Sequence, residues 1–168
     1  GSYNSASGAT ALATNTTGIN NTAHGYRALY LNTTANDNTA VGYQSLYANT
    51  TGTFNTAVGA RSLDANTTGS GNTAVGEDSL SANTTANDNT AFGQNALKAN
   101  TTGASNVAIG GSAGDAITDA DFNVAVGLNA LGAETLGSRS VAVGSAALAN
   151  QNFTSATDAF NTAVGHVA

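Results

Sequence analysis

The sequence predicts an all-β fold, a parallel β-roll of about ten coils, on three observations. The first is a 17-residue repeat in a chain of 168 residues. Second, position 3 of the unit is always Ala and position 5 is always Gly, which leaves no room for a side chain there. Third, β-branched Thr and Val, several Asn and a mid-unit Gly in each copy disfavour helices. Successive copies begin at Asn4, Asn21, Asn38, Asn55, Asn72, Asn89, Asn106, Asn123, Ser140 and Asn161.

Each unit is expected to hold two short strands joined by tight turns, such as "NTAVG" (38–42) and "SLYAN" (45–49). The Leu found at position 9 in eight of nine copies supplies the core. "NTTG" or "NTTA" at positions 12–15 predicts a turn, and we prefer this interpretation of the six NTT sequons to glycosylation. Equal positions should stack about 4.8 Å apart. Columns of Asn and Thr can then carry hydrogen bonds along the rod axis.

Three segments follow from the register of the repeat. Residues 1–149 are regular units, residues 150–160 are an irregular insertion that lengthens the ninth unit by four residues, and residues 161–168 begin a further unit. The chain starts Gly-Ser without Met and stops in mid-pattern. We therefore interpret it as a fragment of a longer protein.

Composition excludes several classes of partner. The net charge is −6 and the four basic residues form no cluster, which opposes binding to nucleic acid. No apolar run approaches the roughly 18 residues of a membrane span, so no membrane contact is expected in this fragment. The absence of Cys rules out disulfides and thiolate metal sites, and no cofactor is expected.

The outward positions of the "NTAVG" strand predict self-association. Positions 2 and 4 should face away from the core because strand side chains alternate. Position 2 changes from Thr to Val107, Val124 and Val141, and position 4 is apolar in most units. An apolar stripe on the outside of a rod needs a partner surface. The predicted interface residues are Val41, Val58, Val75, Phe92, Ile109, Val126 and Val143.

Positions 6, 7 and 10 vary between units and are expected to face solvent. The register places Tyr26 over Tyr43 and Tyr30 over Tyr47. Such aromatic columns could bind sugar rings or a protein partner. The alternative is a stacking ladder that only stabilises neighbouring coils. The candidate ligand-binding residues are Tyr26, Arg27, Tyr30, Tyr43, Gln44 and Tyr47.

Catalysis finds little support in the sequence. His24 and His166 lie about eight coils apart and cannot share a site. Carboxylate pairs such as Glu77 with Asp78, or Asp64 with Glu77 across coils, could in principle cleave glycosides, but solvated surface acids are the better explanation. We therefore expect no enzyme activity.

One aspartate-rich stretch suggests a metal site. The seventh unit lacks its Leu and its "NTTG" turn and carries Asp115, Asp119 and Asp121. Their oxygens could bind Ca²⁺. The alternative is a simple acidic turn.

"SVAVGSAALA" (140–149) resembles the head repeat of trimeric autotransporter adhesins, the YadA-like head. Copies such as "NTAVGYQSLYANTTG" resemble a longer variant found in phage tail fibres and large bacterial surface proteins. The resemblance implies a left-handed, homotrimeric parallel β-roll outside the cell, on a bacterial surface or a virion tail fibre. Its implied role is structural and adhesive, with a host-surface glycan or protein as a possible partner. Two alternatives remain open: a ligand-free spacer and an ice-binding solenoid with Thr columns.

Overall fold

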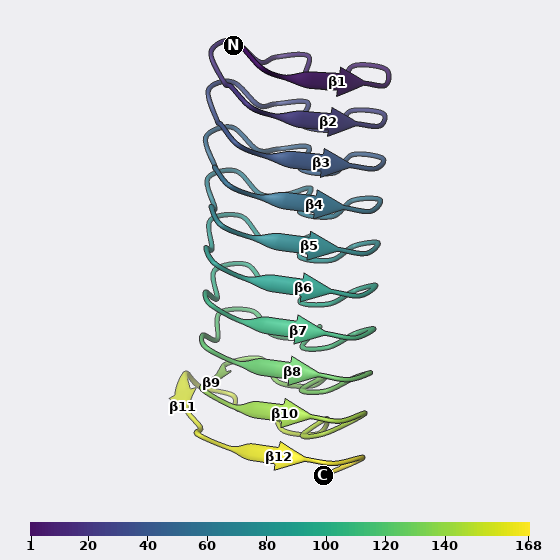
Figure 1. Cartoon of the computed structure of the whole chain (residues 1–168). Helices are drawn as coiled ribbons and strands as arrows, with labels where there is room; N and C mark the ends of the chain where they lie inside the picture. Colours follow the sequence, from purple (N-terminus) through teal and green to yellow (C-terminus); the bar gives the residue numbers. More distant parts are fainter.

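One short strand recurs in every coil of the chain, at positions 2–4 of the unit. The computed structural model describes all 168 residues, contains no helix, and forms a parallel β-solenoid of about nine turns (Figure 1). Ten strands form one sheet in the order β1-β2-β3-β4-β5-β6-β7-β8-β10-β12. Their bounds are β1 Ser5–Ser7, β2 Thr22–His24, β3 Thr39–Val41, β4 Thr56–Val58, β5 Thr73–Val75, β6 Thr90–Phe92, β7 Val107–Ile109, β8 Val124–Val126, β10 Val141–Val143 and β12 Thr162–Val164.

The strand pairing confirms the predicted 17-residue spacing. Ala40 of β3 lies opposite Ala57 of β4, and the same register holds from β1 to β10. Between β10 and β12 the step is longer, because Val141 lies opposite Thr162. We number the coils from coil 1, which begins at Asn4, to coil 10, which begins at Asn161.

The insertion between β10 and β12 is built into the rod. Part of it, β11 (Thr157–Asp158), pairs in parallel with β9 (Gly137–Ser138) as a separate two-stranded sheet. The fully buried Glu134 holds this region: its Oε1 accepts the backbone N–H of Gly137 at 2.7 Å and of Phe153 at 3.2 Å. Its Oε2 accepts Nε2 of Gln151 at 2.9 Å. The extra residues therefore continue the stack of coils instead of interrupting it.

The prediction of a second strand in each coil was wrong. The "SLYAN" segment is a run of turns, because positions 7 and 9 have a left-handed backbone, with φ 54° at Gln44 and 48° at Leu46. A β-strand requires negative φ. The same pair of positive φ angles recurs in coil after coil. The chain therefore reverses sharply at this point, and the reversal carries Leu into the core.

The core is a narrow column of side chains, to which nearly every coil contributes the same small set. Ala of position 3, Ala or Ser of position 8 and Leu of position 9 fill it, and Leu29, Leu46 and Leu63 are completely buried. Gly59 at position 5 has φ 137°, and a Cβ there would lie 2.5 Å from the carbonyl oxygen of Gly76. This contact explains why position 5 accepts no side chain.

Two columns of buried Asn run along the rod and confirm the predicted hydrogen-bond ladders. At position 1, Nδ2 of Asn38 donates to the Gly52 carbonyl at 2.9 Å, and its Oδ1 accepts the N–H of Asn55 at 2.9 Å. At position 12, Nδ2 of Asn49 donates to Oδ1 of Asn32 at 3.1 Å. Each amide thus joins one coil to the next and satisfies its own buried polar atoms.

Coil 7 departs from the unit at two linked positions. Gly114 replaces the core Leu, and Ile117 replaces the ladder Asn and is fully buried. A Cβ on Gly114 would lie 3.0 Å from Cδ1 of Ile117, so the isoleucine occupies the space that the Leu fills elsewhere. The exchange leaves the buried Oδ1 of Asn100, in the coil before, without a hydrogen-bond partner. The core is preserved at the expense of one ladder contact.

Candidate functional site

Positions 6, 7 and 10 of successive coils form the surface that we call the display face. Its aromatic part lies in coils 2 and 3. Tyr26 stacks on Tyr43 and Tyr30 stacks on Tyr47, each pair with ring centroids 5.5 Å apart and with interplanar angles of 16° and 4°. The stacking predicted from the register is therefore confirmed.

Arg27 and Gln44 occupy position 7 between these two aromatic columns. The guanidinium carbon of Arg27 lies 5.1 Å from the ring centroid of Tyr26 and 5.6 Å from that of Tyr30, within the range of cation–π attraction. Gln44 follows one coil later, and its backbone N–H donates to the carbonyl of Tyr26 at 2.9 Å. The six predicted residues therefore lie together, and their role in ligand binding stays a prediction.

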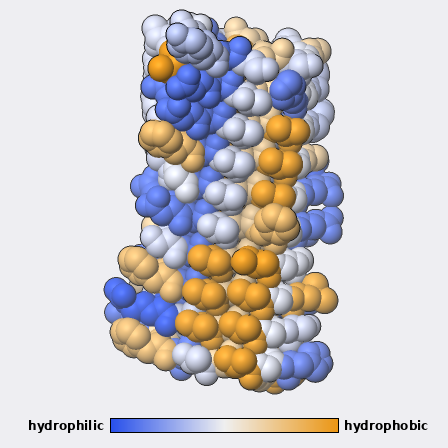
Figure 2. Space-filling model, viewed as in Figure 1, coloured by the Kyte–Doolittle hydropathy of each residue, from blue (hydrophilic) through white to orange (hydrophobic).

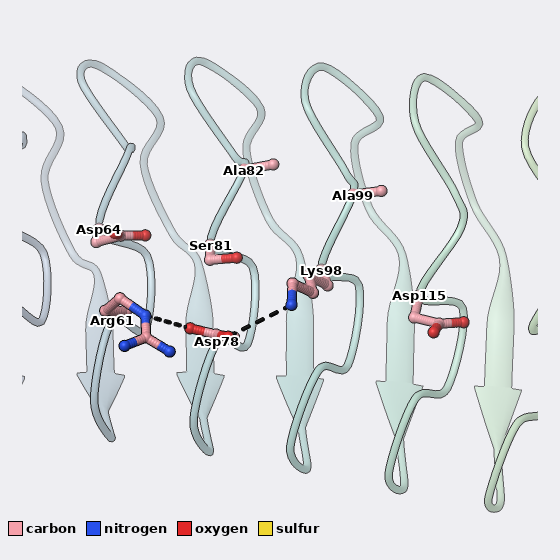
Figure 3. A pocket seen from close by; sticks show the side chains of 8 residues that line it. All are labelled: Arg61, Asp64, Asp78, Ser81, Ala82, Lys98, Ala99 and Asp115. Carbon is pink, nitrogen blue, oxygen red and sulfur yellow. Dashed lines mark hydrogen bonds and ion pairs between the residues drawn. The ribbon is translucent and has the colours of Figure 1, made fainter.

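A groove of about 510 Å³ continues the display face across coils 4–7, and the sequence interpretation missed it. Figure 3 shows its side chains arising from neighbouring turns. At its centre, Nε of Arg61 lies 2.7 Å from Oδ1 of Asp78, and Nζ of Lys98 lies 3.4 Å from Oδ2. The eight lining residues are Arg61, Asp64, Asp78, Ser81, Ala82, Lys98, Ala99 and Asp115.

The carboxylates of the groove have different electrostatic environments. The hydrogen bond from Arg61 lowers the pKa of Asp78, and Lys98 adds to the effect. Burial instead raises the pKa of Asp64 and of Asp115, and neither forms an ion pair. Both cations of the groove therefore contact Asp78, and Arg61 also lies 3.4 Å from Oε1 of Glu77, while Asp64 and Asp115 have no cationic partner.

A second feature is an exposed apolar surface on the sheet. We call the seven position-4 side chains from Val41 to Val143 the apolar stripe. They face outward, and their exposed fractions include 37% for Val41 and 55% for Phe92. In the last coils the partly exposed Val107, Val124 and Val141 at position 2 double its width, as the two orange columns in Figure 2 show.

Exposed phenylalanines lie at position 17, and the sequence interpretation did not single them out. Phe122 and Phe160 are both more than half exposed. The guanidinium carbon of Arg139 lies 4.9 Å from the centroid of Phe122 and 5.9 Å from that of Phe160. The spacing of 17 residues from Phe122 to Arg139 was a usable signal, because it places the two in one column.

The structure does not bring Asp115, Asp119 and Asp121 together as a metal site. Asp119 Oδ1 accepts the hydroxyls of Thr101 and Thr102 at 2.9 and 2.7 Å, and Asp121 Oδ1 accepts the N–H of Ala104 at 2.7 Å. Asp115 belongs to the groove instead. The three lie at positions 10, 14 and 16 of the coil. No group of three His, Cys, Asp or Glu side chains suited to a metal ion occurs in the chain.

The two histidines are far apart along the rod. His24 and His166 lie in coils 2 and 10. None of the protein's elements is a helix long and apolar enough to cross a membrane. No protein-family model matches the chain, and neither a curated protein nor a solved structure matches it.

Proposed function

We propose that the chain is a head or fibre segment of a trimeric surface or phage tail-fibre protein, built as a left-handed solenoid and displaying variable side chains for attachment to a host surface. The observation that carries the proposal is the apolar stripe. It places one outward apolar side chain in each of seven consecutive coils. The proposed location is extracellular.

The shape of the stripe favours association of parallel rods. Because strands of successive coils pair in register, the stripe runs straight along the sheet. Water-exposed apolar patches of this extent usually mark interaction sites. Three identical rods around one axis would each bury the same surface, in a closed symmetric assembly.

The display face remains available in such an assembly. Its residues are at positions 6, 7 and 10, while the apolar stripe is at position 4 on the strand. Between them lies the bend at Gly of position 5. Tyr26 and Tyr43 are 42% and 49% exposed in the single chain. One surface can thus serve assembly and the other can serve attachment.

The two alternatives have less support. A ligand-free spacer would explain the stacked tyrosines but gives no reason for a groove beside them. An ice-binding surface needs free Thr hydroxyls in a long column. At position 13 these hydroxyls donate to the next coil, as Thr50 Oγ1 does to the carbonyl of Thr67 at 3.1 Å. At position 2 the Thr column gives way to Val107.

Charge placed on the apolar stripe tests the proposal. In the variant Val58→Asp/Val75→Asp, carboxylates would have to be buried at the interface between rods, and an unpaired buried charge is strongly unfavourable. We expect the trimer to dissociate while the circular dichroism spectrum is unchanged. Thr68→Asp/Thr85→Asp, two exposed residues at position 14, is the matched control and should stay trimeric. Equal masses for the two variants would contradict the proposal.

A further inference from the structure

We infer that the groove of coils 4–7, together with the open ends of the two tyrosine columns, is a binding site for a neutral glycan. This inference rests on the proposed display function and names its ligand class. The proposed site is the junction where Tyr43 and Tyr47 meet the charged groove, and not the tyrosine columns alone.

The position-10 aromatic column ends where the groove begins, because Asp64 of the lining follows Tyr47 in the next coil, and the position-6 column ends in the same coil beside it. Tyr43 and Tyr47 each have a ring stacked on one side, from Tyr26 and Tyr30. In the next coil the same columns continue with Ala60 and Asp64, which carry no ring. The ring faces turned toward coil 4 therefore have no aromatic partner. An aromatic face of this kind packs against the apolar C–H face of a sugar ring, while the phenol supplies a polar tip.

The groove offers donors and acceptors in alternation. Along position 10 the residues are Asp64, Ser81, Lys98 and Asp115, an acceptor, a hydroxyl, a donor and an acceptor. In Figure 3 these side chains lie in a row across four turns, and the dashed contacts join Asp78 to its two cations. Asp64 and Asp115 keep their oxygens free of ion pairs. Two carboxylates without cationic partners can accept hydrogen bonds from the hydroxyls of a saccharide, and Lys98 and Ser81 between them can donate to its oxygens.

Charge and shape select the ligand class. Three aspartates against Arg61 and Lys98 give the groove a small negative charge, and the chain carries −6, so acidic polysaccharides would be repelled. Only Ala82 and Ala99 are apolar in the lining, which leaves no pocket for a peptide's hydrophobic anchor. A neutral oligosaccharide needs neither a positive surface nor a deep apolar pocket.

The test uses the intact chain and a panel of neutral hexasaccharides, made of glucose, mannose, galactose and N-acetylglucosamine units, with polygalacturonate as the acidic comparison. The readout is proton NMR of the tyrosine rings, which is simple because the chain has five Tyr and no Trp. We expect at least one neutral probe to shift the ring signals of Tyr43 and Tyr47, and polygalacturonate to shift neither.

Matched variants separate binding at the groove from binding elsewhere. Tyr47→Ala and Asp64→Asn should each weaken binding at least tenfold, whereas Tyr3→Ala and Asp88→Asn, exposed residues outside the groove, should leave it unchanged. Asp64→Asn keeps the size of the side chain, so it remains informative if loss of Tyr47 disturbs the stack. Absence of binding by every neutral probe, or equal affinity in all four variants, would overturn the inference. The mass of the native chain, measured in parallel, shows separately whether the proposed assembly has failed.

Discussion

At the scale of single residues, Gly at position 5 sets how closely the coils can stack. Its backbone has φ near 130° in every coil, and the next coil's carbonyl lies where a Cβ would be. We predict that Gly59→Ala lowers the free energy of unfolding by at least about 2 kcal/mol, through backbone strain and the clash with Gly76. Gly111→Ala is the control, because a Cβ there meets only Cδ1 of Leu128, at 3.4 Å. Equal urea midpoints for both variants would contradict this explanation.

The aspartates of the groove predict two opposite dependences of stability on pH. Burial raises the pKa of Asp64 in the folded chain above its pKa in the unfolded chain. The folded state therefore loses stability as the pH rises from the unfolded pKa through the folded pKa. Asp64→Asn should therefore raise the melting temperature at pH 7, with the gain vanishing below about pH 3.

Asp78 should show the opposite dependence, because the hydrogen bond from Arg61 lowers its pKa in the folded chain. The stability that this ion pair contributes is present above the pKa of Asp78 in the unfolded chain, and it is lost as the pH falls through the lower folded pKa. Asp78→Asn should thus lower the melting temperature at pH 7, and thermal scans from pH 2 to 7 check both signs.

At the scale of the coil, the exchange in coil 7 shows that core and ladder positions depend on each other. Gly114→Leu alone would crowd Ile117 and Leu97, and Ile117→Asn alone would leave a cavity beside Gly114. The double variant restores the common unit and offers an amide to the unpaired Oδ1 of Asn100. We predict a favourable coupling of at least about 1 kcal/mol between the two changes, measured by a double-mutant cycle. Additive effects would contradict the packing explanation.

The coil also shows where prediction from sequence succeeds. The strand, the core and the ladders could be predicted from the strictly kept Ala and Gly positions and from the Asn columns. This was possible because residues 17 apart in a regular repeat lie next to each other in neighbouring coils. "SLYAN" was misassigned, since residue types and turn signals do not reveal that Leu46 adopts a left-handed backbone, a conformation rare for Leu. Register likewise predicted the tyrosine stacks. The groove followed from no repeated motif, because it combines variable residues of four coils.

At the scale of the whole molecule, the exposed apolar surface widens toward the C-terminal coils. Position 2 is Thr in β2 to β6 and Val in β7, β8 and β10, so both outward residues of those last three strands are apolar. We predict that Val124→Asp/Val141→Asp weakens association of the chains, whereas Thr39→Asp/Thr56→Asp, at the same position in earlier coils, weakens it less. Sedimentation velocity would give the dissociation constant of each double variant. A larger increase for the Thr39/Thr56 pair than for the Val124/Val141 pair would contradict the prediction.

Sedimentation equilibrium of the unmodified chain over a range of concentrations measures whether the chains associate and how many join. Association through the apolar stripe predicts a mass three times that of one chain, together with a melting temperature that rises with concentration, because assembly stabilises the folded state. A single-chain mass at all concentrations, with a constant melting temperature, would contradict it.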